Sequence, residues 1–140
     1  MASLLKMSDA AALALHATAM LATQPDRSMT AEAIAGGLAV SRNHLAKVLQ
    51  RLGKAGLVRS TRGPAGGFVL ARDAEQVTLA EIYEAMEGPL SAETCLLGKA
   101  VCPAGRCLFH RLVGTVHDLV QERLNKTTLA DLARFFKKVR

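Results

Sequence analysis

The three cysteines of the chain lie close together, and a histidine follows the last of them. The segment reads CLLGKAVCPAGRCLFH from Cys95 to His110, with the spacing C-x6-C-x4-C-x2-H. Two glycines and a proline interrupt it, so a loop rather than a regular helix can bring the thiols around one point. Thiolates bind zinc, copper(I) and iron-sulfur clusters. The pattern therefore predicts a metal or cluster site made by Cys95, Cys102, Cys107 and His110.

The spacing favours an iron-sulfur cluster among these groups. Zinc sites usually contain tighter C-x2-4-C pairs. Looser spacing in a glycine-rich loop suits a larger group, although neither common ferredoxin pattern is matched. If a helix begins near Cys107, this residue and His110 share one face of its first turn. The alternative is three free cysteines that pack as small hydrophobes, and their clustering beside glycine and histidine argues against it.

Charge is strongly segregated along the chain of 140 residues, which has a net charge of +6. Residues 33–72 contain no aspartate or glutamate but many arginines and lysines. Residues 73–98 reverse this pattern, with acidic residues and no lysine or arginine. A solvated surface normally mixes the two signs. We therefore predict that residues 33–72 face phosphate groups.

Two short helices are predicted at and within the start of the basic segment, after a first helix over Ser3–Ala22. Thr30 can cap the second helix, and Gly36-Gly37 should end it early. Ser41 can cap the third, whose apolar residues recur at i, i+3, i+4 and i+7 and are Leu45, Val48, Leu49 and Leu52. Two short helices joined by a small turn predict a helix-turn-helix, in which the second helix enters the major groove of DNA.

The opposite face of the third helix is polar and free of acids, which favours contact with DNA. An ordinary solvated helix face is the alternative, but such faces usually mix glutamate with lysine. The predicted DNA-binding residues of this helix are Ser41, Arg42, Asn43, His44, Lys47 and Arg51.

A β-hairpin with a basic tip is predicted after the third helix, with strands over 57–61 and 68–71. Its glycine-rich tip lets the backbone approach a surface, and an arginine there suits a narrow minor groove. A phosphate-binding loop is excluded because no Lys-Ser or Lys-Thr follows and no helix comes next. The predicted DNA-binding residues of the hairpin are Arg59, Arg62, Gly63 and Gly66.

The remaining chain is predicted to be helical. Thr78 and Glu81 form a capping box that opens a helix to about Glu87. A long amphipathic helix over 108–124 carries an apolar stripe that needs a partner, and a second copy is the simplest one. Thr128 should open a last helix. We therefore divide the chain into a DNA-binding domain (1–88), a cysteine-rich cluster-binding loop (89–107) and a dimerisation helix with a C-terminal helix (108–140).

Several functional classes are not expected. The odd number of cysteines indicates the cytoplasm. The start of the chain loosely imitates a secretion signal, but Asp9 and His16 interrupt its apolar run. No stretch approaches the ~18 uninterrupted apolar residues of a membrane span. Histidines are present, but no pocket or orienting acid can be inferred, so neither catalysis nor a small-molecule substrate is predicted.

Several motifs together resemble the Rrf family of bacterial winged-helix transcription regulators. These are TAEAIA, SRNHLAKVLQRLGKAGLVRSTRGPAGGFVLARD, the cysteine segment and TTLADL. The resemblance covers nearly the whole chain, and GLVRSTRGPAGGF, the family's wing, is its most specific part. It implies a mainly α-helical, dimeric winged helix-turn-helix repressor or activator with a small β-hairpin wing. It also implies long C-terminal dimerisation helices that cross, and a cluster loop that controls DNA affinity.

The resemblance also implies two possible ligand sets. Cys95, Cys102, Cys107 and His110 match family members that hold a two-iron two-sulfur cluster, although the middle cysteine is displaced by one residue. SRNH and TLADL are more similar to members with a four-iron four-sulfur cluster, in which an aspartate near the N-terminus of the other protomer is a ligand. Asp9 stands at about that position. Local geometry favours His110, and we favour the two-iron cluster.

The sequence thus predicts a cytoplasmic homodimer that binds a palindromic operator in double-stranded DNA. Its iron-sulfur cluster would sense redox state, nitric oxide or cluster supply. One alternative is a cluster-free regulator that uses the cysteines as a thiol switch or a zinc site. A small iron-sulfur redox carrier is an alternative of another class, against which the acid-free segment argues.

Overall fold

The computed structural model describes residues 7–64, 66–90, 95–97, 99, 101–103 and 107–139. The elements, in chain order, are α1 (Asp9–Thr23), α2 (Ala31–Leu38), α3 (Arg42–Lys54), β1 (Val58–Thr61), β2 (Gly67–Leu70), α4 (Leu79–Glu87), α5 (His110–Lys126) and α6 (Leu129–Val139). No helix of the described residues is both long enough and apolar enough to cross a membrane.

Side-chain caps set the starts of the helices, as the sequence predicts. The hydroxyls of Thr30 and Ser41 accept from backbone N–H groups in the first turns of α2 and α3. Thr78 and Glu81 form the predicted capping box of α4. Each such cap stabilises a helix by about 1 kcal/mol. Local sequence therefore places the helix-turn-helix and the helix that follows it.

Several predicted helix boundaries differ from the structure; the long helix predicted over 108–124, for example, is α5 over His110–Lys126. The helix predicted from Ser3 begins at Asp9 behind the N-cap Ser8, whose hydroxyl accepts from the amide of Ala11; residues 3–6 lie outside the described residues. The predicted early end of α2 at Gly36-Gly37 is wrong, because α2 runs on to Leu38. A glycine costs a helix only about 1 kcal/mol, and burial of Ile34 on the core side of α2 opposes that cost.

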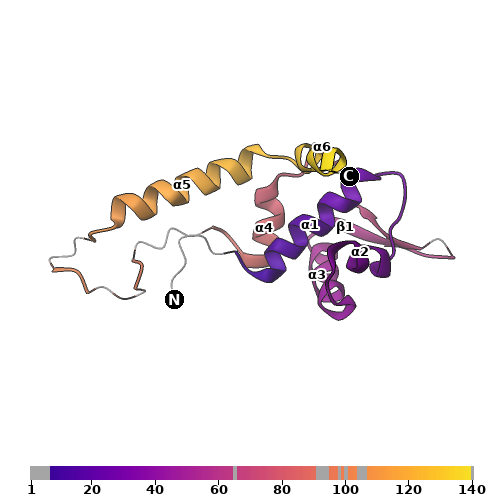
Figure 1. Ribbon diagram of the computed structural model, residues 1–140, viewed down its shortest axis with the longest axis horizontal. Helices are drawn as coiled ribbons and strands as arrows, with labels where there is room; N and C mark the ends of the chain where they lie inside the picture. The colour runs from indigo at the N-terminus through magenta and orange to yellow at the C-terminus, as the bar shows by residue number, and fades with distance from the viewer. Residues whose placement is uncertain are drawn as a thin grey trace.

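The core is organised around α1, which packs against α3, α4 and α6. In Figure 1 α1 crosses the body of the molecule between these helices. Its alanines are buried and small, so neighbouring helices can approach closely. The buried hydroxyl of Thr18 donates to the carbonyl of Ala14 at 2.7 Å, which satisfies the polar group inside the core. The stripe of α3 completes this core with side chains exposed by at most 2%, Leu45, Val48, Leu49 and Leu52.

The predicted hairpin is present, and a third segment extends it. β1 and β2 pair antiparallel with Val58 opposite Leu70 and Thr61 opposite Gly67. Met29, just before α2, exchanges two backbone hydrogen bonds with Phe68 of β2, at 3.0 and 2.8 Å. The hairpin is thereby tied to the helix-turn-helix, which fixes its direction relative to α3.

The C-terminal helices occupy different places. In Figure 1 α5 extends away from the body, whereas α6 returns and lies beside α1. On α5 Val113 is buried, while Leu112 and Leu119 are more than half exposed. Leu129 at the start of α6 is fully buried, and Phe136 packs edge-on against the ring of His16 on α1. α6 is therefore part of the body, and α5 is an arm that leads back to it.

Candidate functional site

The polar face of α3 is exposed along its whole length. The predicted DNA-binding residues of this helix, Ser41, Arg42, Asn43, His44, Lys47 and Arg51, are all exposed, while the apolar stripe is buried. Ser41 acts as the N-cap, and its side-chain oxygen accepts from the amide of His44 at 3.1 Å. Cap and stripe together set the rotation of α3, so the acid-free side of the helix is directed outward.

Two arginines of this face have partners on other helices. Arg42 pairs with Glu32 of α2 at 2.9 Å, and both side chains are well exposed. Such a surface pair contributes about 0–1 kcal/mol, so Arg42 can exchange it for another anion. Arg51 donates from Nη2 to the carbonyl of Met86 at 2.5 Å and lies 3.5 Å from that of Ala85. The structure therefore joins Arg51 to α4.

The tip of the hairpin presents Arg62 to solvent, and Arg59 is exposed on β1. Gly63 has φ of 103°, which other residues rarely adopt. A Cβ at Gly66 would lie 2.7 Å from the carbonyl oxygen of Thr61, so only glycine fits this tight turn. The predicted tip residues thus form a narrow, basic projection; residue 65 lies outside the described residues.

A shallow groove joins the end of α3 to the hairpin, and it includes residues that the sequence prediction omitted. Gln50 of α3 and Ser60 of β1 line it together with the predicted Arg59. Gln50 stands three residues after Lys47 on the exposed side of α3. That spacing could have identified it, whereas the contribution of Ser60 depends on the packing of the hairpin against α3.

The three cysteines are free thiols and half-exposed. Cys95 donates from Sγ to the carbonyl of Lys99 at 3.1 Å, which forms a local turn. His110 is exposed and is the first residue of α5, and its amide donates to the carbonyl of Cys107 at 3.4 Å. α5 therefore begins after Cys107, and the pair lies in the turn that enters the helix rather than on one helical face.

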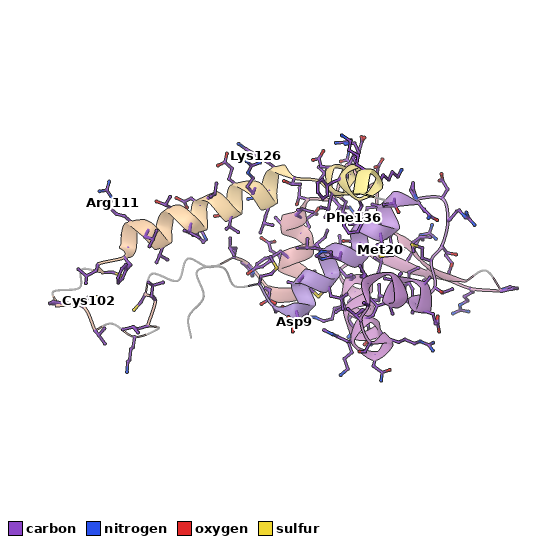
Figure 2. All side chains as sticks on the ribbon, in the orientation of Figure 1. Asp9, Met20, Cys102, Arg111, Lys126 and Phe136 are labelled. Atoms are coloured by element: carbon purple, nitrogen blue, oxygen red, sulfur yellow. The ribbon has the colours of Figure 1, made fainter. Side chains whose placement is uncertain are left out.

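The predicted ligands are not assembled within the described residues. Over these residues no three histidine, cysteine, aspartate or glutamate side chains come close enough to hold a metal ion. Asp9 is exposed at the start of α1, and Figure 2 shows it on the body, far along the molecule from Cys102 beyond the start of α5. Asp9 lines a shallow hollow with His16 of α1 and His44 of α3. Within the described residues Asp9 therefore lies apart from the three cysteines.

The donor chemistry of the segment fits a thiophilic group. Three unpaired, partly accessible thiols and one exposed imidazole are ligands that zinc and iron-sulfur clusters accept. Residues 95–107 lie within the connection between α4 and α5, so any group bound there would act on the link between body and arm.

Residues 7–134 match the model of the Rrf2 family, which is described as a family of iron-dependent transcriptional regulators. The chain belongs to the Rrf2 family. It is 34% identical over 134 residues to an HTH-type transcriptional regulator of Aquifex aeolicus. This match covers 94% of this chain and 93% of the relative. The family prediction is thereby confirmed.

Two further relatives refine the comparison. The chain is 38% identical over 94 residues to the transcriptional regulator IscR of Cronobacter sakazakii, but the match spans 66% of this chain and only 57% of IscR. The fold is similar to that of CymR, the global cysteine regulator of Bacillus subtilis, with a TM-score of 0.78, 33% identity and coverage of 94% and 98% of the two chains. The predicted winged-helix fold class is confirmed, and this Rrf2 chain is a transcriptional regulator.

Proposed function

We propose that this Rrf2 regulator is a cytoplasmic, non-catalytic homodimer that binds a palindromic operator, and that a thiolate-bound iron-sulfur cluster sets its operator affinity. The observation that carries the proposal is the position of three free, half-exposed cysteines between α4 of the DNA-binding body and α5. The segment that would hold the cluster continues into the body on one side and into the arm on the other, so a bound group can influence both.

DNA binding would use α3 and the hairpin tip together. The exposed side of α3, from Ser41 to Lys47, would lie in the major groove. Arg62, supported by the tight turn at Gly63 and Gly66, would enter the neighbouring minor groove. Arg59 and Gln50 line the groove between these two elements and would contact the backbone that separates them.

Dimerisation would use α5. Leu112 and Leu119 are 51% and 57% exposed on a helix that leaves the body. Val116 and Val120 are half-buried on the same side. A second α5 packed against this stripe would remove it from water, at about 25 cal/mol for each Å² buried. Two copies related by a two-fold axis would then present two α3 helices to two half-sites of a palindrome.

Cys95, Cys102 and Cys107 would hold the cluster. His110 would supply the fourth ligand from the same chain, with Asp9 of a second chain as the alternative. We favour a two-iron two-sulfur cluster with His110, and a four-iron four-sulfur cluster with Asp9 is the other form. When bound, such a cluster supplies a centre sensitive to redox state, nitric oxide and iron-sulfur supply. Ligation through residues 95–110 would hold the ends of α4 and α5 in one relative position.

A cluster-free regulator is a second candidate, and one specific finding favours it. The chain is 33% identical to CymR over nearly its whole length, and CymR is described as a global cysteine regulator. In that case the cysteines would act as a thiol switch or hold zinc. A small iron-sulfur redox carrier receives no support, because the family and its relatives are transcriptional regulators.

Anaerobic reconstitution with ferrous iron and sulfide tests the proposal. We expect visible absorbance, two iron and two sulfide per chain for the favoured cluster, and a change in operator affinity between loaded and apo protein. Electron paramagnetic resonance of the reduced protein would distinguish the two cluster types. Colourless protein that binds one zinc ion, or that responds only to thiol oxidation, would establish the second candidate instead.

A further inference from the structure

The C-terminal turn of α4 is capped by a side chain from α3. The last carbonyls of a helix have no partner within the helix. Here the amide of Gly88 donates to the carbonyl of Glu84 at 2.8 Å. Nη2 of Arg51 donates to the carbonyl of Met86 at 2.5 Å and to that of Ala85 at 3.5 Å. The last turn of α4 contains no basic residue of its own. The Arg51 guanidinium thus supplies both the missing donor and the positive charge that a helix C-terminus favours.

Other parts of the molecule meet the chain at this same turn. Ser8, the N-cap of α1, donates its hydroxyl to Glu87 Oε1. Nε2 of His117 on α5 lies 3.3 Å from Leu90 O. The chain passes through Gly88, with φ of 76°, into the cysteine-rich segment 89–107. α1 and α3 therefore contact the last turn of α4, and α5 contacts the first residues of this segment.

We propose that Arg51 is a positioning residue that couples the state of the cysteine segment to the orientation of α3, and that it is not a phosphate contact. This rests on the proposed function, in which residues 89–107 control operator affinity. Arg51 lies in the last turn of α3, whereas Arg42 to Lys47 lie in its first turns. One end of α3 would then read DNA while the other follows the carbonyls of α4.

The coupling has a simple physical basis. If ligation of the cysteine segment shifts residues 85–88, the carbonyls move relative to α3. Arg51 must then follow them or give up the hydrogen bonds by which it caps the end of α4. A small displacement at the start of the segment is thereby converted into a tilt of α3 against its neighbours.

Three substitutions in the full-length protein distinguish a basic residue that positions α3 from one that contacts a phosphate. Arg51→Met removes every donor and keeps the length of the side chain. Arg51→Lys keeps the charge, but a single ammonium cannot reproduce the planar guanidinium fork. Lys47→Met is the matched control, because Lys47 is an exposed cation on the same helix, one turn before Arg51.

Each protein is studied in two states of the segment. One is reconstituted with ferrous iron and sulfide, and the other carries Cys95→Ser, Cys102→Ser and Cys107→Ser. Operator affinity is measured by fluorescence anisotropy over a salt series. The quantity of interest is the ratio of the two affinities, and coupling between sites commonly amounts to about 5–150-fold.

We expect Arg51→Met and Arg51→Lys to reduce this ratio by about tenfold, within the usual range of coupling, and to leave the salt dependence unchanged. Lys47→Met should keep the ratio and flatten the log-log salt slope by about 0.9, the value for one phosphate contact. The proposal is overturned if Arg51→Met flattens the slope in this way and preserves the ratio, or if Arg51→Lys behaves as the parent in both. Should Arg51→Met fail to fold, Arg51→Lys alone decides.

The parent protein distinguishes failure of this inference from failure of the proposed function. If its two states bind the operator equally, the cysteine segment does not control affinity, and both proposals fall. If the parent shows a ratio and the Arg51 variants retain it, only the role of Arg51 is wrong.

Discussion

The body of the molecule, formed by α1 to α4, the hairpin and α6, differs from the arm formed by α5 in where its apolar side chains lie. In the body Ile34, Leu45 and Leu52 are completely buried. On the arm Leu112 and Leu119 are more than half exposed although they have the same amphipathic spacing. Burying one such side chain contributes about 1.5–3 kcal/mol. The body can therefore stabilise itself, whereas the arm needs a second surface.

The same contrast applies to polar residues. In the body the helix caps have partners within the chain, such as those of the Thr78 and Glu81 capping box, while the polar face of α3 is open to solvent. In the cysteine segment the thiols are free and partly accessible. Polar groups with partners inside the chain stabilise the fold, whereas accessible thiols outside disulfides are free to bind another group. The arm and the cysteine segment are for this reason where the regulatory properties are expected to reside.

The largest effect is expected from a charge on the apolar side of the arm. Val116→Glu would bury an unpaired carboxylate in the proposed dimer contact, which costs about 3–5 kcal/mol and weakens association by more than 100-fold. Sedimentation velocity should show a monomer at concentrations where the parent is a dimer. Cooperative binding to a two-half-site operator should be lost as well.

Asp118→Lys is the matched control on the arm, because the Asp118 side chain is 84% exposed on the opposite side of α5. It should remain a dimer. A dimeric Val116→Glu protein would show that the stripe of α5 packs against its own body, and the comparison between arm and body would then fail.

The next effect concerns the fourth ligand of the cluster. His110→Ala should alter the absorbance and paramagnetic resonance of the reconstituted protein if this residue ligates, because it lies in the turn next to Cys107. Asp9→Ala is the paired variant. If only Asp9→Ala changes the spectra, the ligand comes from the body of a second chain, and the arm and body are joined across the dimer.

The sequence predicted the body well because its signals are local. The caps Thr30, Ser41 and Thr78 and the stripe of α3 require only neighbouring residues to be recognised, and all are confirmed. The end of α2 was predicted wrongly because burial of Ile34 opposes the cost of two glycines, and burial depends on distant residues. The bridge between Met29 and Phe68 is likewise invisible in local patterns.

The candidate site was less predictable from sequence. The spacing of the cysteines indicates a ligand set, but its assembly depends on a bound group or a second chain. Arg51 shows the limit for charged residues. Its position on α3 predicts a DNA contact, and its partners on α4 become visible only when the two helices are packed together. A charge pattern identifies a basic surface, but it does not show which of its arginines and lysines contact DNA and which bind another helix.

A moderate effect is expected at the DNA surface of the body. Lys47→Ala should weaken binding to specific and random duplexes alike and flatten the log-log salt slope by about 0.9, as for one lost phosphate contact. Lys54→Ala is a useful comparison, because Lys54 is the last residue of α3, far from its first turns. It should change the slope less. Equal salt dependence of the Lys47→Ala variant and the parent would remove Lys47 from the interface.

The smallest effect is expected from acid pH on the caps of the body. The hydrogen bond from Arg72 lowers the pKa of Glu81, with a further contribution from the amide of Thr78, while partial burial opposes the shift. A carboxylate with a lowered pKa stabilises the folded state above its unfolded pKa, near the ordinary 4.5, and loses that contribution as the pH falls through the folded value. Because the Arg72–Glu81 pair is about 40% exposed, we expect at most about 1 kcal/mol.

Glu81→Gln tests this expectation, since glutamine can keep the capping box but not the ion pair with Arg72. Urea denaturation from pH 7 to pH 3 should show the variant less stable than the parent at neutral pH and equal to it at the acid end. A difference that stays constant with pH would mean that the carboxylate charge contributes nothing and that the box alone fixes α4. Because α4 leads into the cysteine segment, the same titration followed by operator binding would show whether loosening this cap in the body is transmitted to the arm.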